Sequence, residues 1–402
     1  MGIYTVYPGN GDAAGSLQET LLKEDVSDLI TNLFPLDTPL QQALGTQAMT
    51  SVFTEYPVDT FSSIFRTAAV VGNGGVADPG ALTNLGLLAK PEGYTYTAST
   101  PQYPAKLKAV VEIQGRRFQV SGTDRSVSMY GIGDRYNYEM VKVMKNVVND
   151  FEQAFWWSKG TSPAGLDLDS GAEVFTMRQS QGLMWWILKS GLARSKMSGG
   201  LPGLCSTSAC TDGVGNAFGS SSTLGTAAGS WAYDANGVSL DQAMFKERLM
   251  GPWWQLTNRG GAGAMGFASP RIKNLFSQFA LSSNGPINER TIDAAAKRVV
   301  DTVDWYETDY GVVSITMSRY LSLTGQTITV RHDDTGAGDT TVACDECLVF
   351  IHPEYFKIGK LRGVSYSPLA KTGDFDDGQI VGEQGLLCTN PQGGAALVNC
   401  IA

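Results

Sequence analysis

Cysteine and histidine are the residues of this chain best suited to metal or redox chemistry. It has two histidines and six cysteines, namely Cys205, Cys210, Cys344, Cys347, Cys388 and Cys400. Cys344 and Cys347 have the spacing of a zinc knuckle, and the last two cysteines could complete four thiolates. However, the four are spaced unlike any compact zinc module, and Asp345-Glu346 lies where a knuckle prefers small residues. We therefore expect free thiols, while disulfides between Cys205 and Cys210 or between Cys344 and Cys347 stay open.

The two histidines give no catalytic constellation. His332 follows Arg331 in a turn-rich loop, which favours a solvated side chain. His352 precedes Pro353 at the end of an apolar strand, which favours a structural role. A general base also needs a positioned nucleophile, and none accompanies either residue. The sequence therefore predicts no catalytic residue, no cofactor-binding residue and no metal site.

Glycine and aspartate clusters are candidates for phosphate and calcium sites. The glycines at 72–75 and 260–263 lack the strand–loop–helix context of a nucleotide site, so we expect loops. Asp374, Asp376 and Asp377 could bind calcium, but the EF-hand spacing is missing and a solvated acidic turn is expected.

Tryptophan and arginine pairs carry the remaining candidates for binding. The Trp pairs at 156/157, 185/186 and 253/254 end or lie within apolar segments, so packing in a core or interface is expected rather than stacking on a ligand. Arg116-Arg117 is interpreted either as an ordinary solvated pair or as a partner for acidic groups across a subunit boundary.

The composition points to a chain that depends on neighbours. Of 402 residues, 43% are hydrophobic and only 17% are charged, and 47 are glycine. Long stretches of Gly, Ser, Thr and Ala cannot bury enough surface to fold alone, so we expect them to lie on other subunits. The net charge of −9 predicts weak nonspecific attraction to DNA. No signal peptide or membrane-spanning apolar run is found, so we expect synthesis in the cytoplasm and no membrane contact.

The elements that must carry these residues fall into an elongated order. Residues 1–23 are nearly without pattern, residues 23–33 predict a short amphipathic helix, and a strand begins at Thr50. Residues 61–104 are rich in Gly, Ala and Pro, and alternation returns over 105–120. Two strands around a long unpatterned segment predict a hairpin-like excursion that lies on a partner.

The clearest helix is predicted over residues 134–159. Apolar side chains recur there at helical spacing, Asp134 can cap the start, and Lys159-Gly160 gives a basic last turn and a stop. Its length of roughly 39 Å exceeds what a small domain needs, so it is expected to be a spine for other elements.

The rest of the chain mixes helices and strands. Residues 195–239 predict a low-complexity insertion, and 240–257 predict a helix that bends at Gly251-Pro252. A short strand over 263–268 precedes a helix that starts at Pro270. Strands with a turn at Asp309-Tyr310-Gly311 follow over 303–321, and further strands are expected over 341–366 and 378–401.

Four ordered motifs resemble the major capsid proteins of tailed phages. The first is Ser27-Asp-Leu-Ile-Thr-Asn-Leu-Phe-Pro-Leu-Asp-Thr-Pro39, and the second is Val120-Ser-Gly-Thr123 with Tyr130-Gly131 before the long helix. The third joins Val303-Asp-Trp-Tyr-Glu-Thr-Asp-Tyr-Gly311 to Met317-Ser-Arg-Tyr320. The fourth is Ile351-His-Pro-Glu-Tyr-Phe-Lys357 with Leu361-Arg362 and Ala370-Lys-Thr-Gly-Asp374. Together they cover 27–374, and only 195–239 departs from the family pattern.

The resemblance implies an α+β protein with the Hong Kong 97-type capsid fold. It implies an N-terminal arm over 1–49, an extended loop over 50–120 and a peripheral domain over 121–194 that contains the spine helix 134–159. An axial domain over 240–340 and return strands of the peripheral domain over 341–402 would follow the insertion. Some relatives join subunits through a Lys–Asn bond, but nothing singles out partners for Lys90, so no cross-link is predicted.

The implied function is assembly of an icosahedral phage head around double-stranded DNA, without sequence-specific binding. The expected partners are copies of the chain in pentamers and hexamers, a portal and decoration proteins. The start at Met1 argues against removal of a long scaffolding segment, so a separate scaffolding protein is expected. The alternatives are a tail or decoration protein, which should lack the spine helix, and an encapsulin-like cellular shell. A hydrolase or oxidoreductase would need a site that these residues do not assemble.

Overall fold

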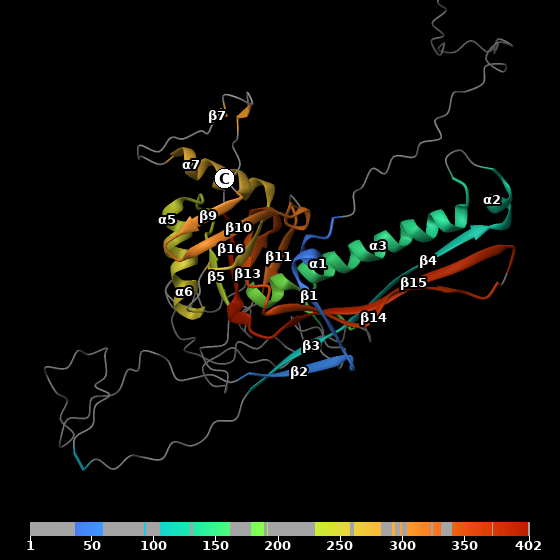
Figure 1. Cartoon of the computed structure of the whole chain (residues 1–402), viewed down its shortest axis with the longest axis horizontal. Helices are drawn as coiled ribbons and strands as arrows, with labels where there is room; N and C mark the ends of the chain where they lie inside the picture. Colours follow the sequence, from blue (N-terminus) through green and yellow to red (C-terminus); the bar gives the residue numbers. More distant parts are fainter. Residues whose placement is uncertain are drawn as a thin grey trace, which may run out of the picture.

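The described part of the chain forms an elongated unit joined to a compact lobe (Figure 1). The computed structural model describes residues 37–58, 92–93, 105–128, 132–160, 178–188, 191, 230–257, 261–282, 292–293, 298–299, 304–322, 325–330, 340–371 and 373–400. The mixture of helices and sheets confirms the expected α+β class. The helix expected at 23–33, nearly all of 61–104 and most of 195–239 lie outside the described residues.

A four-stranded sheet forms the elongated unit, in the order β1-β14-β15-β4. Its strands are β1 (Gly45–Ala48), β14 (Phe356–Pro368), β15 (Phe375–Cys388) and β4 (Glu112–Ser121). β15 pairs antiparallel with both β14 and β4, whereas β1 adds to β14 in parallel. The two long strands β14 and β15 set the length of this unit (Figure 1).

Helix α3 (Arg135–Trp157) lies along this sheet and is the expected spine (Figure 1). Asp134 caps its start, because its side chain accepts a hydrogen bond from Tyr136 N at 3.0 Å. Its apolar stripe, which includes Val147 and Phe151, is buried against the sheet. The helix ends two residues earlier than expected, because Ser158 is already extended, and Gly160 lies beyond the end with φ of 78°.

A hairpin root leads into the long excursion. β2 (Phe53–Val58) and β3 (Ala105–Val110) pair antiparallel, with Val58 opposite Ala105, as the alternating patterns predicted. The short helix α1 (Pro39–Ala43) precedes this root, and α2 (Gly122–Ser126) lies at the far tip of the elongated unit (Figure 1).

A six-stranded sheet forms the compact lobe, in the order β5-β16-β13-β6-β10-β9. Its strands are β5 (Trp231–Asp234), β16 (Gly394–Val398), β13 (Leu348–Ile351), β6 (Ala264–Ala268), β10 (Gly311–Met317) and β9 (Trp305–Thr308). One face packs with Phe245, Trp253 and Phe276 of the neighbouring helices into one apolar core. The other face meets the end of α3, where the Trp156 ring lies 5.3 Å from that of Phe267.

The expected helix over 240–257 forms, with a different local geometry from the predicted bend. α5 (Gln242–Met244) runs into a π-helical turn (Phe245–Met250) and then α6 (Gly251–Thr257). Pro252 has no N–H to donate to Arg248 O, and that oxygen instead accepts a hydrogen bond from Trp231 Nε1 at 2.7 Å. The wider turn thus accommodates the proline within a continuous helical run.

Two other predictions of local structure are confirmed. β6 is followed by α7 (Pro270–Ser282), and β9 and β10 form a hairpin. The remaining elements are short: β7 (Ile292–Asp293), β8 (Arg298–Val299), β11 (Thr327–Val330), β12 (Thr340–Ala343) and the 3-10 turns Arg319–Leu321, Cys344–Glu346 and Pro391–Gly393. Among the described residues, no helix is long and apolar enough to cross a membrane.

Each of the two large sheets combines strands from several of the expected segments of the chain. β13 and β16 come from 341–402, the expected return strands of the peripheral domain, and lie in the six-stranded sheet, whereas β14 and β15 from the same range lie in the four-stranded sheet. β5 comes from 195–239, the expected insertion, and pairs in parallel with β16. Burial on both faces of the central strands explains this, because their apolar runs suit the middle of a sheet that is covered on both sides.

Candidate assembly surface

One of the two histidines considered for catalysis, His352, is packed into the core. His352 is 2% exposed, and its ring lies 5.0 Å from that of Trp253. Within the described ranges, no three His, Cys, Asp or Glu residues come together in a way that could hold a metal ion. His332, Lys90 and the glycines at 72–75 lie outside the described residues.

The four described cysteines are free and buried. Burial, followed by the nearby Cys344 and Cys400 thiols, raises the pKa of Cys347 well above its ordinary value. Cys388 ends β15, opposite Phe356. Burial, and then the charge of a Cys388 thiolate, raises the pKa of Tyr56 above its ordinary value. Thiols with raised pKa values are poor metal ligands and poor nucleophiles, so these residues behave as small apolar side chains. Cys205 and Cys210 lie outside the described part.

Two aspartates of the acidic turn at 374–377, Asp376 and Asp377, are ion-paired rather than solvated, contrary to expectation, while Asp374 is exposed as expected. Asp376 accepts hydrogen bonds from Arg125 and Lys371, and those from Lys371 and then Arg125 lower its pKa. Asp377 is 3% exposed and pairs with Arg117. The two arginines come from β4 and α2, more than 200 positions away in sequence, so local spacing could not indicate them, whereas Lys371 is close to Asp376 in sequence.

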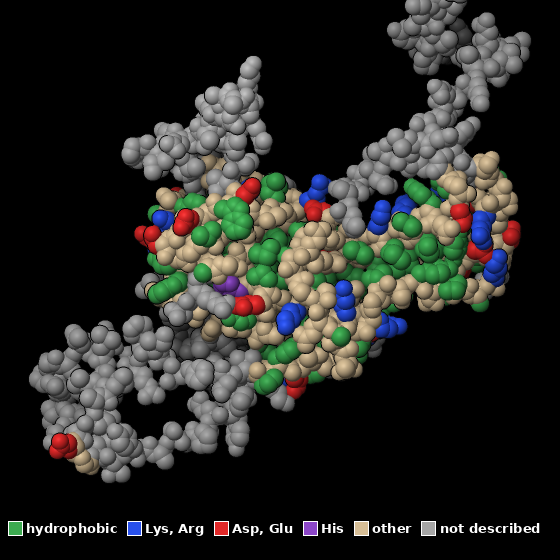
Figure 2. Space-filling model, viewed as in Figure 1, with side chains coloured by type: hydrophobic (Ala, Val, Ile, Leu, Met, Phe, Trp, Pro, Cys, Tyr) green, Lys and Arg blue, Asp and Glu red, His purple; other side chains and the backbone are tan. Residues whose placement is uncertain are grey.

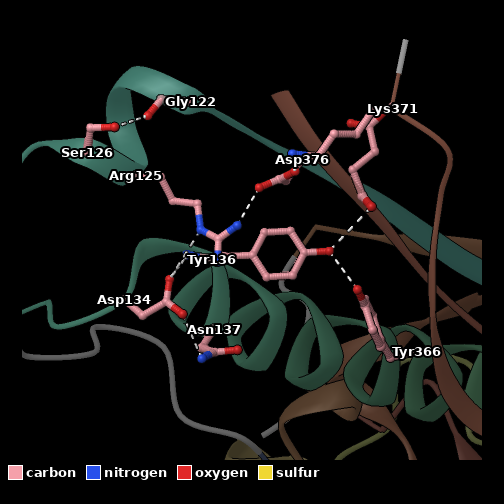
Figure 3. A network of polar contacts seen from close by, with 10 residues as sticks. Gly122, Arg125, Ser126, Asp134, Tyr136, Asn137, Tyr366, Lys371 and Asp376 are labelled. Carbon is pink, nitrogen blue, oxygen red and sulfur yellow. Dashed lines mark hydrogen bonds and ion pairs between the residues drawn. The ribbon is translucent and has the colours of Figure 1, made fainter. Parts of the chain in front are cut away.

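These contacts belong to a network that fastens the tip of the elongated unit (Figure 3). The hydroxyl groups of Tyr136 and Tyr366 lie 2.6 Å apart, and Tyr136 also donates to Asp377 O at 3.3 Å. Burial and the Tyr366 hydrogen bond raise the pKa of Tyr136 to about 12. The network therefore joins the start of α3 to both long strands, and Figure 2 shows charged side chains of both signs gathered at this end.

Arg116 and Arg117 both find acidic partners within the chain. Arg116 makes a two-pronged contact with Asp150 of α3, at 2.6 Å and 2.7 Å. Arg117 pairs with the buried Asp377. The pair therefore connects β4 to α3 and β15 within the chain, while both arginine side chains stay about half exposed.

A shallow hollow of about 540 Å³ opens between β4 and α3, with Ile113, Arg116, Asp150 and Trp157 in its lining. β4 is an edge strand of its sheet, since among the described strands only β15 pairs with it. Ile113 is 50% exposed there, and Trp305 on β9, an edge strand of the six-stranded sheet, is 70% exposed. Free strand edges that carry exposed apolar side chains are suited to contact with another chain.

Packing accounts for most of the tryptophan pairs, as expected. Trp156, Trp185, Trp186 and Trp253 are at most 5% exposed. Trp157 is half-buried and donates to Tyr320 O at 2.7 Å. Trp254 differs from the rest, since it is 43% exposed beside Tyr310.

Two buried carboxyl groups were not foreseen. Glu152 of α3 accepts hydrogen bonds from Leu40 N at 2.7 Å, Gln41 N at 3.1 Å and Trp156 Nε1 at 3.1 Å, and burial raises its pKa. Glu112 of β4 accepts one from Ser180 N at 2.9 Å, and burial raises its pKa to about 7. A single Glu inside an apolar pattern was the available signal, since the backbone donors are distant in sequence.

Comparisons with known proteins agree with this architecture. The family model described as SU10 major capsid protein matches residues 8–400. The chain is similar to the capsid of cyanophage A-1(L), with 9% identity, a TM-score of 0.54 and coverage of 95% of this chain and 98% of that chain. It is also similar to the capsids of native and empty GTA particles, with TM-scores of 0.52 and 0.51, 10% identity and coverage of 98% of this chain and 100% of each. No curated protein sequence matches. At these identities the structural likeness shows a shared fold.

Proposed function

The chain belongs to the SU10 major capsid protein family, and we propose a route by which it builds the head of a tailed phage. Members of this family are structural capsid proteins with the Hong Kong 97-type fold, and they form icosahedral shells. The observation that carries the proposal is the family match over 8–400, with the spine helix and the long sheet in the described part.

Assembly would proceed by burial of segments that have no core of their own. The arm over 1–49 and the loop over 50–120 would lie on adjacent subunits beyond the parts that this chain packs itself, such as β1 and β4, and the neighbours would supply the missing burial. The free edges of β4 and β9 support this, because each offers exposed backbone and apolar side chains to a neighbour. Each contact could be weak, since a closed shell is stabilised by many contacts at once.

The same proposal extends to the partners. The chain would form pentamers and hexamers and would enclose double-stranded DNA after synthesis in the host cytoplasm. A separate scaffolding protein, a portal and decoration proteins would complete the head. The net charge of −9 supports a wall that does not bind the packaged DNA tightly. The role is structural, with no catalytic step.

The experiment compares the full chain with a variant whose loop is cut short. Val58 and Ala105 are opposite each other in the β2–β3 hairpin, so Asn-Gly can replace 59–104 without changing the register. Size-exclusion chromatography and negative-stain microscopy should show closed particles, tens of nanometres across, for the full chain only. A full chain that stays monomeric or forms a small ring would contradict the proposed function. Closed particles from the shortened variant would contradict the role of the loop.

A further inference from the structure

A buried polar cluster lies where the loop hairpin joins the elongated sheet. It consists of Glu112, Gln114, Ser180 and Gln384, which we call the Glu112 cluster. Glu112 begins β4, directly after Val111, whose N–H donates to Val52 O at 3.1 Å in the hairpin root. The carboxyl group of Glu112 accepts hydrogen bonds from Ser180 N at 2.9 Å and from Gln114 Nε2. Glu112 therefore holds residues 178–181 against the base of the loop.

The surroundings of the cluster are dry and closely packed. Glu112 is 4% exposed, Gln384 is 5% exposed and Ser180 is fully buried. Ser180 Oγ also accepts a hydrogen bond from Leu386 N at 2.9 Å, which joins the segment to β15. A Cβ atom at Gly385 would lie 2.6 Å from Val110 O, so β15 can approach the hairpin root only with glycine there.

Two acceptor oxygens of the cluster have no hydrogen-bond donor within the described part of the chain. Glu112 and Gln384 are opposite each other in the β4–β15 register, so their side chains share one face of the sheet. Gln384 Oε1 is buried and has no hydrogen-bond partner among the described atoms, and the same holds for Gln114 Oε1. An ionised Glu112 would add two further acceptor oxygens, whereas a protonated one supplies an O–H donor beside Gln384. One bound proton would therefore give Gln384 Oε1 a donor.

We propose that Glu112 holds a proton that it donates to Gln384 Oε1, and that loss of this proton loosens the base of the loop. Burial supports the proposal, because it raises the pKa of Glu112 to about 7 even though the Ser180 and Gln114 hydrogen bonds lower it. Deprotonation places a carboxylate oxygen against the Gln384 carbonyl in a site that excludes water. That contact is repulsive and destabilises the closed root, so the open form of the root gains population.

The charged groups around the cluster do not neutralise Glu112. Arg178 precedes Ser180 and pairs with Glu383 of β15, as does Arg362 of β14. Lys360 of β14 is opposite Gln384 on its other side and is exposed. The ion pairs made by the described residues include none to Glu112, so its proton is the remaining means of removing its charge.

The direction of the pH dependence follows from this. Because the pKa of Glu112 is higher in the closed root than its ordinary value of 4.5, the closed root is most stable below that value. Its stability falls as the pH rises through the window up to about 7. From about pH 5 to about pH 8, the ratio of open to closed root should rise on the order of 50-fold.

Hydrogen–deuterium exchange of the full chain measures this ratio. Peptides over 105–121 and 178–188 are followed from about pH 5 to about pH 8 in the wild type and in Glu112→Gln. The variant keeps a neutral side chain with an N–H donor for Gln384, so it imitates the protonated acid. The rate ratio of wild type to variant should rise on the order of 50-fold over this range, since intrinsic exchange cancels. A ratio that does not change with pH would overturn the proposal.

Two further measurements keep the outcome unambiguous. Glu139→Gln also removes a negative charge, from an ion pair with Arg135 on α3. In this variant the exchange rates of both peptides should depend on pH as they do in the wild type. If Glu112→Gln fails to fold, the wild-type rates are divided by those of the urea-unfolded chain at each pH, and a flat profile then overturns the proposal. The role of the loop in assembly rests on the proposed function. Hydrogen exchange measures the subunit, whereas microscopy measures particle formation. The Glu112 proposal and the proposed function can therefore fail independently.

Discussion

At the residue scale, Glu152 is a buried carboxyl group that holds the helix before the first strand. Its oxygens accept two backbone N–H groups of α1 and the indole N–H of Trp156. Thr38, at the start of α1, makes no side-chain cap, so Glu152 caps the helix from α3. Glu152→Ala leaves three donors without an acceptor and should lower the free energy of unfolding by about 3 kcal/mol. Urea unfolding followed by circular dichroism measures this loss.

A second carboxyl group of the same helix supplies the control for Glu152. Glu139 pairs with Arg135 at 2.9 Å and with Lys142 at 3.8 Å, both within the helix. Pairs of this kind contribute about 0.3–0.5 kcal/mol, so Glu139→Ala should change unfolding far less. Equal losses in the two variants would mean that the backbone contacts of Glu152 add nothing.

The sequence predicted packed residues better than polar ones. Tryptophans in apolar segments were expected in a core, and four of the six in pairs are buried, because apolar context is a local property. The backbone partners of Glu152 are 111 and 112 positions away, and the arginine partners of Asp376 and Asp377 are more than 250 away. Such pairings depend on the fold, so Asp376 and Asp377 were wrongly expected to be solvated.

At the element scale, the end of α3 joins the two sheets through one of two adjacent tryptophans. Trp156 is fully buried, and its ring meets that of Phe267 in β6 edge to face. Trp156→Ala should cost about 3–5 kcal/mol, because it leaves a cavity between the spine and the compact lobe. Trp157→Ala removes a half-buried ring and the hydrogen bond to Tyr320 O, and should cost less. Thermal unfolding of both variants tests this ranking of stability losses, and a larger loss of stability for Trp157→Ala would contradict it.

The elements were predicted well where their pattern is local and less well where sheet order decides. The spine was expected over 134–159 and is found at Arg135–Trp157, because its cap and apolar period lie within the segment. β13, β16 and β5 were assigned to other segments, since an apolar run does not indicate which sheet it joins. The π-helical turn before Pro252 escaped prediction because Arg248 O is satisfied by Trp231, from a segment that was interpreted as an insertion.

At the scale of the whole molecule, charge sets how the subunit meets DNA. A net charge of −9 on 402 residues opposes nonspecific binding, which depends on the release of counterions by basic side chains. Several exposed cations, such as Arg116 and Lys371, are already paired with Asp150 and Asp376. We therefore expect the unassembled subunit to bind a labelled DNA duplex with a dissociation constant weaker than about 100 µM at physiological salt.

Fluorescence anisotropy of the duplex measures this affinity, and lower salt provides the internal check. The net charge of −9 repels the duplex at every salt concentration, so a fall in ionic strength should strengthen any binding only slightly. Saturable binding at about 10 µM in physiological salt, with a steep salt dependence, would contradict the prediction. That result would place free cations on a surface of the subunit, and the shell wall would then hold DNA by direct contact. Without it, confinement by a closed shell is sufficient to keep the genome inside.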